Sequence, residues 1–439
     1  MVLLALALTT MLQWALAPAS VPEPPAPPHP PSEPLFRPTA MMDFAALEEV
    51  ILRQSPALDP ADLEVELAAA DLQQSRLLPN PSVDLGWGTI PVGRLNPPGL
   101  ARPLANVPNY SAGLAYTFPI AKRRPEIRRS AALQTAARAN RDATVRALTL
   151  ELAAVLGQIA VATLRREGMT SLVENARRAL ELAGQRLDGS FEARLDFDRH
   201  SIDLDRSEQL LRSPASDISA ALAACAGLVA MRCEGFANRA DARAFLDRWI
   251  DRGRPEGTPA DRPDLKALAA NEAAAVAEER LGRAQGVPSP TLRFGYFHDR
   301  FVVSGNQMNS LNVSVSFPLP VFDHGQAVVA GARARRAHFA AERRRRLVAS
   351  EMRIEALVRL VANQRARQEA LTRQILPRAR VVLQDVESAA ARRVASLNDV
   401  FQSRRTMSEL LLEEADSYAD AFNAYLELLA EFPREPDPQ

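Results

Sequence analysis

Two cysteines offer the clearest covalent chemistry in this sequence, because Cys225 and Cys233 are its only thiols and lie eight residues apart. In an exported protein, such a pair can form a disulfide. On one straight helix the two residues would lie about 12 Å apart, which is too far for a bridge. A disulfide therefore requires the helix to break between them, near Gly227. Without that break, both cysteines remain free thiols.

The other residue types that commonly perform chemistry form no recognisable site. The histidines are scattered over segments of different predicted structure: His29, His200, His298, His324 and His338. Two cysteines without a convincing histidine partner do not make a zinc site. The sequence contains no phosphate-binding P-loop, no HExxH motif and no CxxC motif. We therefore expect no enzyme activity, no metal site and no cofactor.

The composition is that of a folded protein, and its N-terminal region indicates export. The 439 residues are 47% hydrophobic, and 53 basic side chains balance 53 acidic ones, so nothing indicates a nucleic-acid partner. Residues 1–19 combine an apolar stretch with small residues near its end, which predicts a secretory signal peptide. Residues 20–40 form a proline-rich, extended linker. We expect no other apolar run of about 18 residues, and hence no membrane-spanning helix.

The rest of the chain repeats one order of elements: a short helix, a strand pair and a long helical hairpin. Each hairpin is predicted to have a short interruption, at 193–196 in the first copy and at 395–398 in the second. The sequence LPNP at 78–81 returns as VPSP at 287–290, and the Phe-Pro pair at 118–119 returns at 317–318. Offsets that agree within about ten residues indicate an internal duplication. The predicted segments are a first repeat at 41–230 with a strand pair at 81–119, a connecting segment at 231–262, a second repeat at 263–432 with a strand pair at 289–318, and a tail at 433–439.

The four predicted strands alternate apolar side chains with small or polar ones, the pattern of strands with two different faces. A soluble core would produce the same alternation. Two features favour a membrane barrel: the small, hydrophilic opposite face, and aromatic residues near the strand ends. The side chains expected to face lipid are Val83, Leu85, Trp87, Tyr110, Leu114, Tyr116, Phe118, Leu292, Phe294, Tyr296, Leu311, Val313, Val315 and Phe317.

Four strands are too few for a membrane barrel. In lipid a sheet must close, because an open edge leaves backbone groups without hydrogen bonds, and about eight strands are the practical minimum. Several chains must therefore share one barrel. Two chains would supply eight strands and three would supply twelve. A channel with an aqueous lumen favours the larger number.

The helical segments are longer than a globular domain needs. The predicted helix at 120–187 is about 100 Å long. Apolar residues recur at spacings of three and four, as in coiled coils. These seams are Val145, Leu148, Leu152, Val155, Ile159 and Ala162 in the first half, and Leu411, Ala415, Tyr418, Phe422, Tyr425 and Leu429 in the second. Pro377 should interrupt the corresponding second-half helix. The four arginines at 343–346 spread around a helix and are expected to form a solvated or salt-bridged surface instead of a nucleic-acid site.

The order and duplicated spacing of several stretches resemble the TolC family of outer-membrane efflux proteins. The resemblance covers residues 44–432, and the matching stretches are LPNPSVDL, YSAGLAYTFPI, RPDLKALAANEAAAVAEERL, VPSPTLRFGY, VSFPLPVFDHGQA and LTRQILPRARVVL. Within the family, VSFPLPVFDHGQA and AKRRPEI are similar to stretches of heavy-metal efflux components of the CzcC kind. The glycines of the second stretch are absent here. Drug efflux and type I secretion are the alternative functions.

The resemblance implies a mainly α fold with a β-barrel portion. It implies a homotrimer whose twelve strands form an outer-membrane barrel in contact with lipid and whose twelve helices form a periplasmic tunnel. The implied partners are a periplasmic adaptor protein and an inner-membrane pump of the resistance-nodulation-division (RND) class. Most of the chain would lie in the periplasm, and the segment 231–262 would lie in an equatorial belt with both cysteines.

The resemblance also places adaptor docking and pore closure at the tips of the helical hairpins. By position, these tips are residues 186–196 and 393–399, with Arg186, Gly189, Leu195, Asp196, Leu397, Asn398 and Asp399 as the candidate residues. Asp196 and Asp399 are candidates for a gate or cation-sensing ring. The alternative is that both aspartates cap the returning helices. A periplasmic coiled-coil scaffold that is not a channel remains the competing class of protein.

Overall fold

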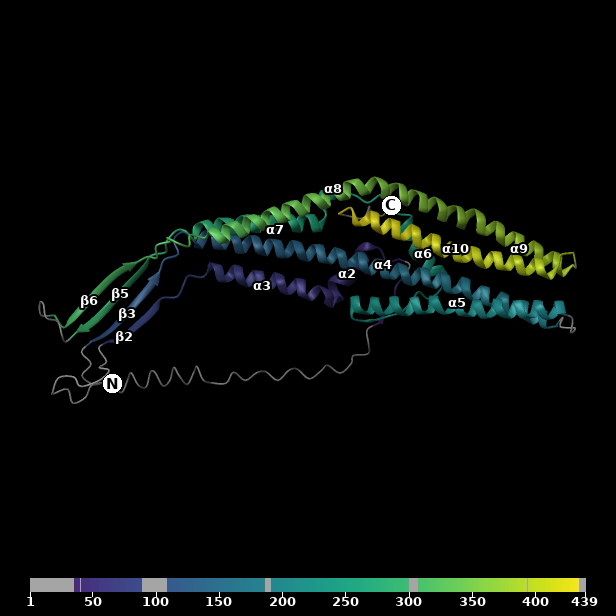
Figure 1. Ribbon diagram of the computed structural model, residues 1–439, viewed down its shortest axis with the longest axis horizontal. Coiled ribbons are helices and arrows are strands. Elements are labelled where there is room, and N and C mark those ends of the chain that lie inside the picture. The colour runs from purple at the N-terminus through teal and green to yellow at the C-terminus, as the bar shows by residue number, and fades with distance from the viewer. Residues whose placement is uncertain are drawn as a thin grey trace, which may run out of the picture.

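The protein is an elongated molecule with a small β-sheet at one end and long helices over the rest of its length (Figure 1). A computed structural model describes residues 35–39, 41–88, 109–185, 191–299, 307–392 and 394–433. The predicted signal peptide and most of the predicted linker lie outside these residues. The end of that linker differs from expectation, because Leu35–Phe36 form strand β1, which pairs in parallel with β4, Arg232–Cys233.

The four predicted strands form one antiparallel sheet. The first pair is β2, Ser82–Gly88, and β3, Asn109–Thr117; the second is β5, Thr291–Asp299, and β6, Asn309–Ser316. Their order is β2-β3-β5-β6, so the two repeats join at the centre of the sheet through the pairing of β3 with β5. A hairpin is only marginally stable by itself, whereas a sheet of four strands buries more backbone.

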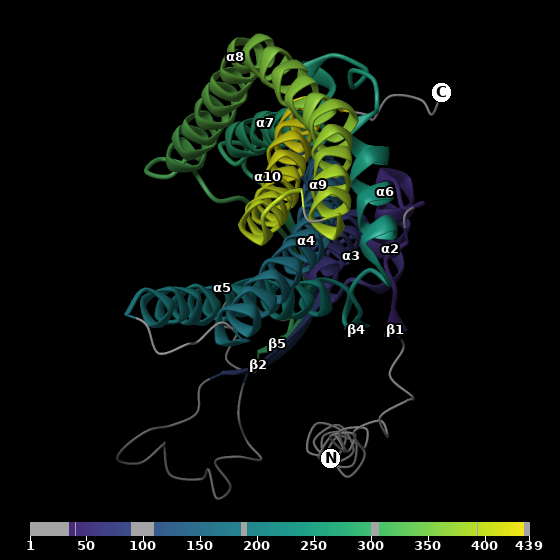
Figure 2. The same ribbon diagram turned by 90° about the vertical axis from the view of Figure 1, so that its right-hand side faces the viewer.

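Two long helical hairpins extend away from the sheet (Figure 1). The first consists of α4, Arg123–Gln185, and α5, Phe191–Val229. The second consists of α8, Gln326–Ala370, and α9, Leu376–Ala391, followed by the returning α10, Leu397–Ala430. Seen along the molecule, α4 lies between α5 and α10 and contacts both (Figure 2).

Two shorter helices continue the line of α5 and α10 towards the sheet (Figure 1). They are α3, Asp59–Arg76, and α7, Pro263–Ala284. A 3-10 turn precedes each of them, η1 at Pro56–Leu58 and η2 at Pro259–Asp261. Helix α3 packs on α4, and α7 packs between α4 and α8. The helices therefore form one curved layer with α3 and α5 at one edge and α8 and α9 at the other.

Pro377 interrupts the second long helix, as predicted. Helix α8 ends at Ala370, the π-helical turn η3 spans Leu371–Ile375, and Pro377 lies in the first turn of α9. Proline has no backbone N–H and its ring crowds the preceding turn, so the chain widens locally to keep its other hydrogen bonds.

The interruptions between paired helices lie slightly earlier than predicted. Residues 193–196 were expected to break the first hairpin, but they belong to α5, which begins at Phe191. Residues 395–398 were expected to break the second, but α10 already begins at Leu397. Helix ends depend on caps more than on apolar spacing, and Ser396 caps α10.

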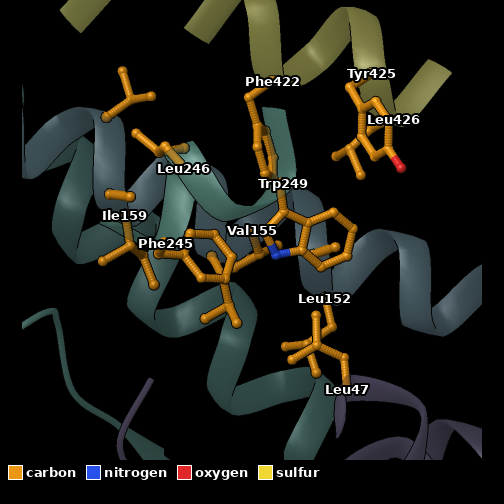
Figure 3. Packing of buried hydrophobic residues seen from close by; sticks show 14 of the residues in the cluster. Leu47, Leu152, Val155, Ile159, Phe245, Leu246, Trp249, Phe422, Tyr425 and Leu426 are labelled. Atoms are coloured by element: carbon orange, nitrogen blue, oxygen red, sulfur yellow. The ribbon is translucent and has the colours of Figure 1, made fainter. Parts of the chain in front are cut away.

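The hydrophobic core lies midway along the helices, where two short helices cover them. They are α2, Phe44–Gln54, and α6, Arg239–Ile250. Trp249 and Phe422 pack edge to face with ring centroids 5.8 Å apart (Figure 3). Both predicted seams contribute: all their residues are buried except Leu148 and Leu411, which are partly exposed. Gly157 is required here, because a Cβ atom would lie 2.1 Å from the Phe422 ring.

One stretch of α4 is more apolar than the sequence analysis recognised. An 18-residue window has a mean hydropathy of 1.8, which makes α4 long and apolar enough to cross a membrane by composition. However, 67% of that window is buried inside the protein. This apolar stretch of α4 therefore contributes its side chains to the hydrophobic core.

Two core tyrosines differ in whether their hydroxyl groups have a hydrogen-bond partner. Removing the two hydroxyl groups should therefore change the stability of the protein in opposite directions. Tyr418 donates a 2.7 Å hydrogen bond to Asp247, whereas the buried Tyr425 hydroxyl has no hydrogen-bond partner among the described residues. We expect Tyr425→Phe to stabilise the protein by about 1 kcal/mol and Tyr418→Phe to destabilise it by a similar amount. Thermal unfolding in detergent measures both; equal effects would contradict the assignment.

The difference in stability between the wild-type protein and Tyr425→Phe should also depend on pH. Burial raises the pKa of Tyr425 to about 12, whereas an unfolded tyrosine titrates near about 10. Between these values the folded state holds a proton that the unfolded state has lost. The contribution of Tyr425 to stability is therefore complete below about pH 10 and is lost as the pH rises towards about 12. Tyr425→Phe should flatten this alkaline decline.

Candidate functional site: a two-faced sheet joined to a helical wall

One face of the sheet is apolar and exposed. Cross-strand pairs match apolar residues in register: Val83 with Leu114, Leu114 with Phe294, and Phe294 with Val313. The predicted lipid-facing residues of the four strands therefore share one face. Most are exposed, and Tyr116 and Tyr296 are half-buried. Monomeric soluble proteins rarely expose so continuous an apolar patch.

Aromatic residues lie at both ends of this face. At the end farther from the helices, Trp87 pairs with Tyr110, and the Tyr110 ring stacks on His298 with centroids 4.4 Å apart. At the helical end, Phe118 and Phe317 lie one residue beyond β3 and β6. Such bands at both limits of an apolar surface are typical of membrane β-barrels.

The opposite face carries mainly small and polar side chains. Ser111, Ser314 and Asn312 are typical members, and glycines occupy several positions between them. Only side chains of this kind leave room for water inside a small barrel.

The turn between sheet and helix contains the motif VSFPLPVFDHGQA, and its residues hold the turn. The Gly325 N–H donates to Oδ1 of Asp323 at 2.9 Å, and the Gln326 amide donates to the carbonyl of Phe322 at 2.8 Å. Gly325 has a positive φ of 84°, and a Cβ atom there would lie 2.0 Å from the Gly282 carbonyl. The motif therefore fixes the angle between the sheet and α8.

The predicted tip residues fall into three groups. Arg186 and Gly189 lie outside the described residues. Leu195 and Asp196 lie in the second turn of α5, where Asp196 accepts a 3.4 Å hydrogen bond from Arg199 and is no cap. Leu397, Asn398 and Asp399 form the first turn of α10.

Asp399 takes part in a capping box at the start of α10. Its backbone N–H donates to the Ser396 hydroxyl at 3.2 Å, and its carboxylate accepts from the Ser396 hydroxyl and backbone N–H at 2.7 and 2.9 Å. These hydrogen bonds lower the pKa of Asp399, the Ser396 side chain contributing most. Helix capping is thus a present role of Asp399, and the gate remains a prediction.

A groove near the tips has no clear signal in the sequence. It lies between α4, α5 and α10, and His200 and Phe401 face each other in it with ring centroids 6.5 Å apart. Asp203 and Arg405 also line it. The signal was hard to find, because these residues are about 200 positions apart and become neighbours only when both hairpins lie on α4.

Comparisons with known proteins agree with this geometry. No protein-family model and no curated protein matches the chain. Among solved structures, it is similar to the outer-membrane channel CmeC of Campylobacter jejuni, at 14% identity and a TM-score of 0.65 over 90% of this chain and 87% of that one. It is also similar to the outer-membrane protein VceC of Vibrio cholerae, at 17% identity and a TM-score of 0.62, covering 89% and 96%.

The chain has the fold of TolC-type outer-membrane channels. A third similar structure is that of CusC, whose crystal structures concern the conformational changes that accompany folding and transmembrane channel formation. It has 15% identity and a TM-score of 0.66, covering 94% of this chain and 99% of that one. The family resemblance noted from the sequence is therefore confirmed at the level of the fold.

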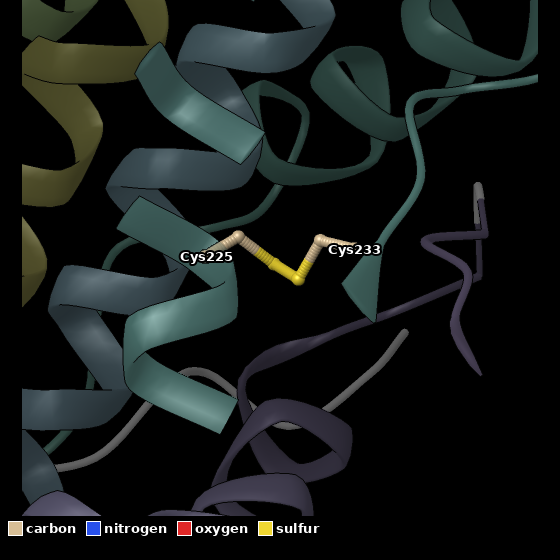
Figure 4. Close-up of a disulfide and its surroundings, with 2 residues drawn as sticks. All are labelled: Cys225 and Cys233. Carbon is tan, nitrogen blue, oxygen red and sulfur yellow. A yellow bond between two sulfur atoms is a disulfide. The ribbon is translucent and has the colours of Figure 1, made fainter. Parts of the chain in front are cut away.

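In this channel fold, a disulfide joins the first hairpin to the connecting segment. Cys225 near the end of α5 bonds to Cys233 in β4, with the Cα atoms 6.1 Å apart (Figure 4). The helix breaks slightly later than expected: α5 continues past Gly227 to Val229, and Ala230 reverses the chain with a φ of 50°. Because β4 pairs with β1, the bond also ties the N-terminal strand to the helical wall.

The disulfide should stabilise the centre of the molecule. Closing a loop of this length reduces the entropy of the unfolded chain by an amount worth about 2–3 kcal/mol. A thiol reductant should therefore lower the melting temperature of the wild-type protein. The double variant Cys225→Ala/Cys233→Ala serves as the control and should not respond. An equal response in both proteins would contradict this role.

Charge clusters on the helices are ion pairs within the protein. Arg345 and Arg346 both donate to Glu342 at 2.7 Å, and Arg343 lies 3.5 Å from Glu272. The expectation of a solvated or salt-bridged surface is therefore confirmed at Arg343, Arg345 and Arg346. In the described ranges, no group of three or more His, Cys, Asp or Glu side chains is placed to hold a metal ion.

Proposed function

We propose that this protein is the subunit of a homotrimeric outer-membrane exit duct. One observation carries the proposal: a four-stranded sheet exposes a continuous apolar face and, within the described residues, has β2 and β6 as edge strands. In lipid those edges must pair, because unpaired backbone groups are costly there.

The strand directions allow the edges of neighbouring copies to pair. All three pairings within the sheet are antiparallel, so β2 and β6 run in opposite directions. The β6 edge of one copy can therefore continue as an antiparallel ladder into β2 of the next. Three copies would close a barrel of twelve strands, wide enough for an aqueous lumen.

The helical layer has matching edges. Strand β2 follows α3 and β6 precedes α8, so each sheet edge lies on the same side as one helix edge. Apolar side chains are exposed at both helix edges, including Leu63 and Leu67 on α3 and Met352 on α8. The contact that closes the barrel would cover them and would join the hairpins into a tunnel of twelve helices.

The family resemblance supports the proposed partners and cargo. A passive duct needs energy from elsewhere, so we propose a periplasmic adaptor and an inner-membrane RND pump, with the hairpin tips facing them. The CzcC-like turn motif favours heavy-metal cations as cargo. A deletion strain should then become sensitive to metal salts. Sensitivity to drugs, or loss of a secreted protein, would identify multidrug efflux or type I secretion instead.

The decisive experiment is reconstitution. Purified protein should elute from detergent as a trimer by light scattering and should produce stepwise conductance in planar bilayers. A scaffold would remain in the aqueous periplasmic extract. A water-soluble monomer without affinity for bilayers would therefore overturn the proposal.

A further inference from the structure

The polar face of the sheet contains two side chains that are much larger than the rest. Its positions on the described strands are Ser82, Asp84, Gly86, Gly88, Asn109, Ser111, Gly113, Ala115, Thr117, Thr291, Arg293, Gly295, Phe297, Asp299, Ser310, Asn312, Ser314 and Ser316. Arg293 and Phe297 exceed all the others in size. Both lie on β5, four residues apart, so they face the same side about 13 Å apart along the strand.

Arg293 reaches across β3 to Asp84 on β2. Its Nε lies 3.4 Å from Oδ2 of Asp84. In register, Arg293 pairs with Ala115, and Asp84 pairs with Gly113. The small residues of β3 leave the crossing free, and Ala115 is only 5% exposed. Both side chains keep about half of their surface exposed on this face, at 58% for Arg293 and 44% for Asp84, and the Oδ2 atom of Asp84 that faces Arg293 is itself buried.

Phe297 is an apolar exception on this face. It pairs with Ser111 on one side and Ser310 on the other, and it stays 37% exposed. A phenyl ring that packs on small polar neighbours contributes little to the core. Its exposed position makes it an obstruction above a hydrophilic wall.

We infer that Arg293 and Asp84 set the charge selectivity of the barrel lumen and that Phe297 forms its narrowest apolar ring. The inference rests on the proposed function, because that function makes the polar face a lumen. Three copies would place three charge-balanced pairs around the axis, and rings of charge determine which ions pass. The intact pairs contribute no net charge, so cargo of either sign is admitted at this level.

Reversal potentials under a KCl gradient test this inference in planar bilayers. Asp84→Asn leaves three arginines and should lower the cation-to-anion permeability ratio by about twofold or more. Arg293→Gln leaves the three Asp84 carboxylates without their arginine and should raise that ratio by a similar factor. The double variant should return to the wild-type ratio. Phe297→Ser should increase the conductance without moving the reversal potential.

Arg37→Gln is the matched control. Arg37 is an exposed arginine outside the four-stranded sheet, and its Nε lies 2.7 Å from the Glu234 carboxylate. It should leave the permeability ratio unchanged. If one single variant fails to insert, the opposite shift of the other still tests the pair. If the variants conduct but their reversal potentials do not shift in opposite directions, the inference is wrong and the proposed function still stands. No conductance from the wild-type protein would overturn the proposed function instead.

Discussion

Val313→Arg is expected to remove the protein from the outer membrane. Val313 lies in the middle of β6, pairs with Phe294 and is 66% exposed on the apolar face. An arginine at the lipid-facing midplane of a barrel costs about 2–4 kcal/mol, and one trimer would contain three of them. Membrane fractionation and light scattering of detergent extracts should show the loss of both the membrane-bound form and the trimer.

Asn312→Arg provides the control for this prediction. Asn312 is the preceding residue on the same strand, but it lies on the polar face, opposite Gly295, which has no side chain. The substitution adds the same charge and length, and it should leave insertion and the trimer intact. If both variants insert equally well, the apolar face does not meet lipid.

Glu414→Leu is expected to destabilise the protein by about 3–5 kcal/mol, because it leaves two arginines without their shared carboxylate. The Glu414 side chain on α10 is fully buried. Arg239 on α6 donates to it, and Arg243 lies 3.3 Å from its other oxygen. This contact joins the connecting segment to the helical wall. Thermal or denaturant unfolding in detergent measures the loss.

Glu413→Gln is the matched control for the buried carboxylate. Glu413 is the neighbouring residue, half-exposed, and its partner Arg367 lies 3.7 Å away. Exposed pairs of this kind contribute about 0–1 kcal/mol. Adding Arg239→Leu to Glu414→Leu should recover part of the lost stability, since it removes one of the two arginines that lost Glu414. Equal losses of stability for Glu413→Gln and Glu414→Leu would show that burial of the Glu414 carboxylate does not raise the cost of removing it.

Local pattern determined much of this protein from its sequence alone. Period-two alternation placed the four strands and their two faces, because successive side chains of a strand point to opposite sides. Spacings of three and four placed the seams at Val145 and Leu429, and Pro377 marked the interruption of the second helix. These features depend on residues that are close together in the chain, so the order of residue types is enough to predict them.

The tertiary structure decided what depends on contacts between distant segments. The pairing of β3 with β5, which joins the repeats, brings Arg293 near Asp84, 209 positions earlier in the chain. The disulfide required the reversal at Ala230, and the buried Glu414 is distinguishable from the exposed Glu413 only once α6 covers α10. Charged residues look alike in a sequence, whereas burial and partner distance, which set their energies, arise only when the helices pack.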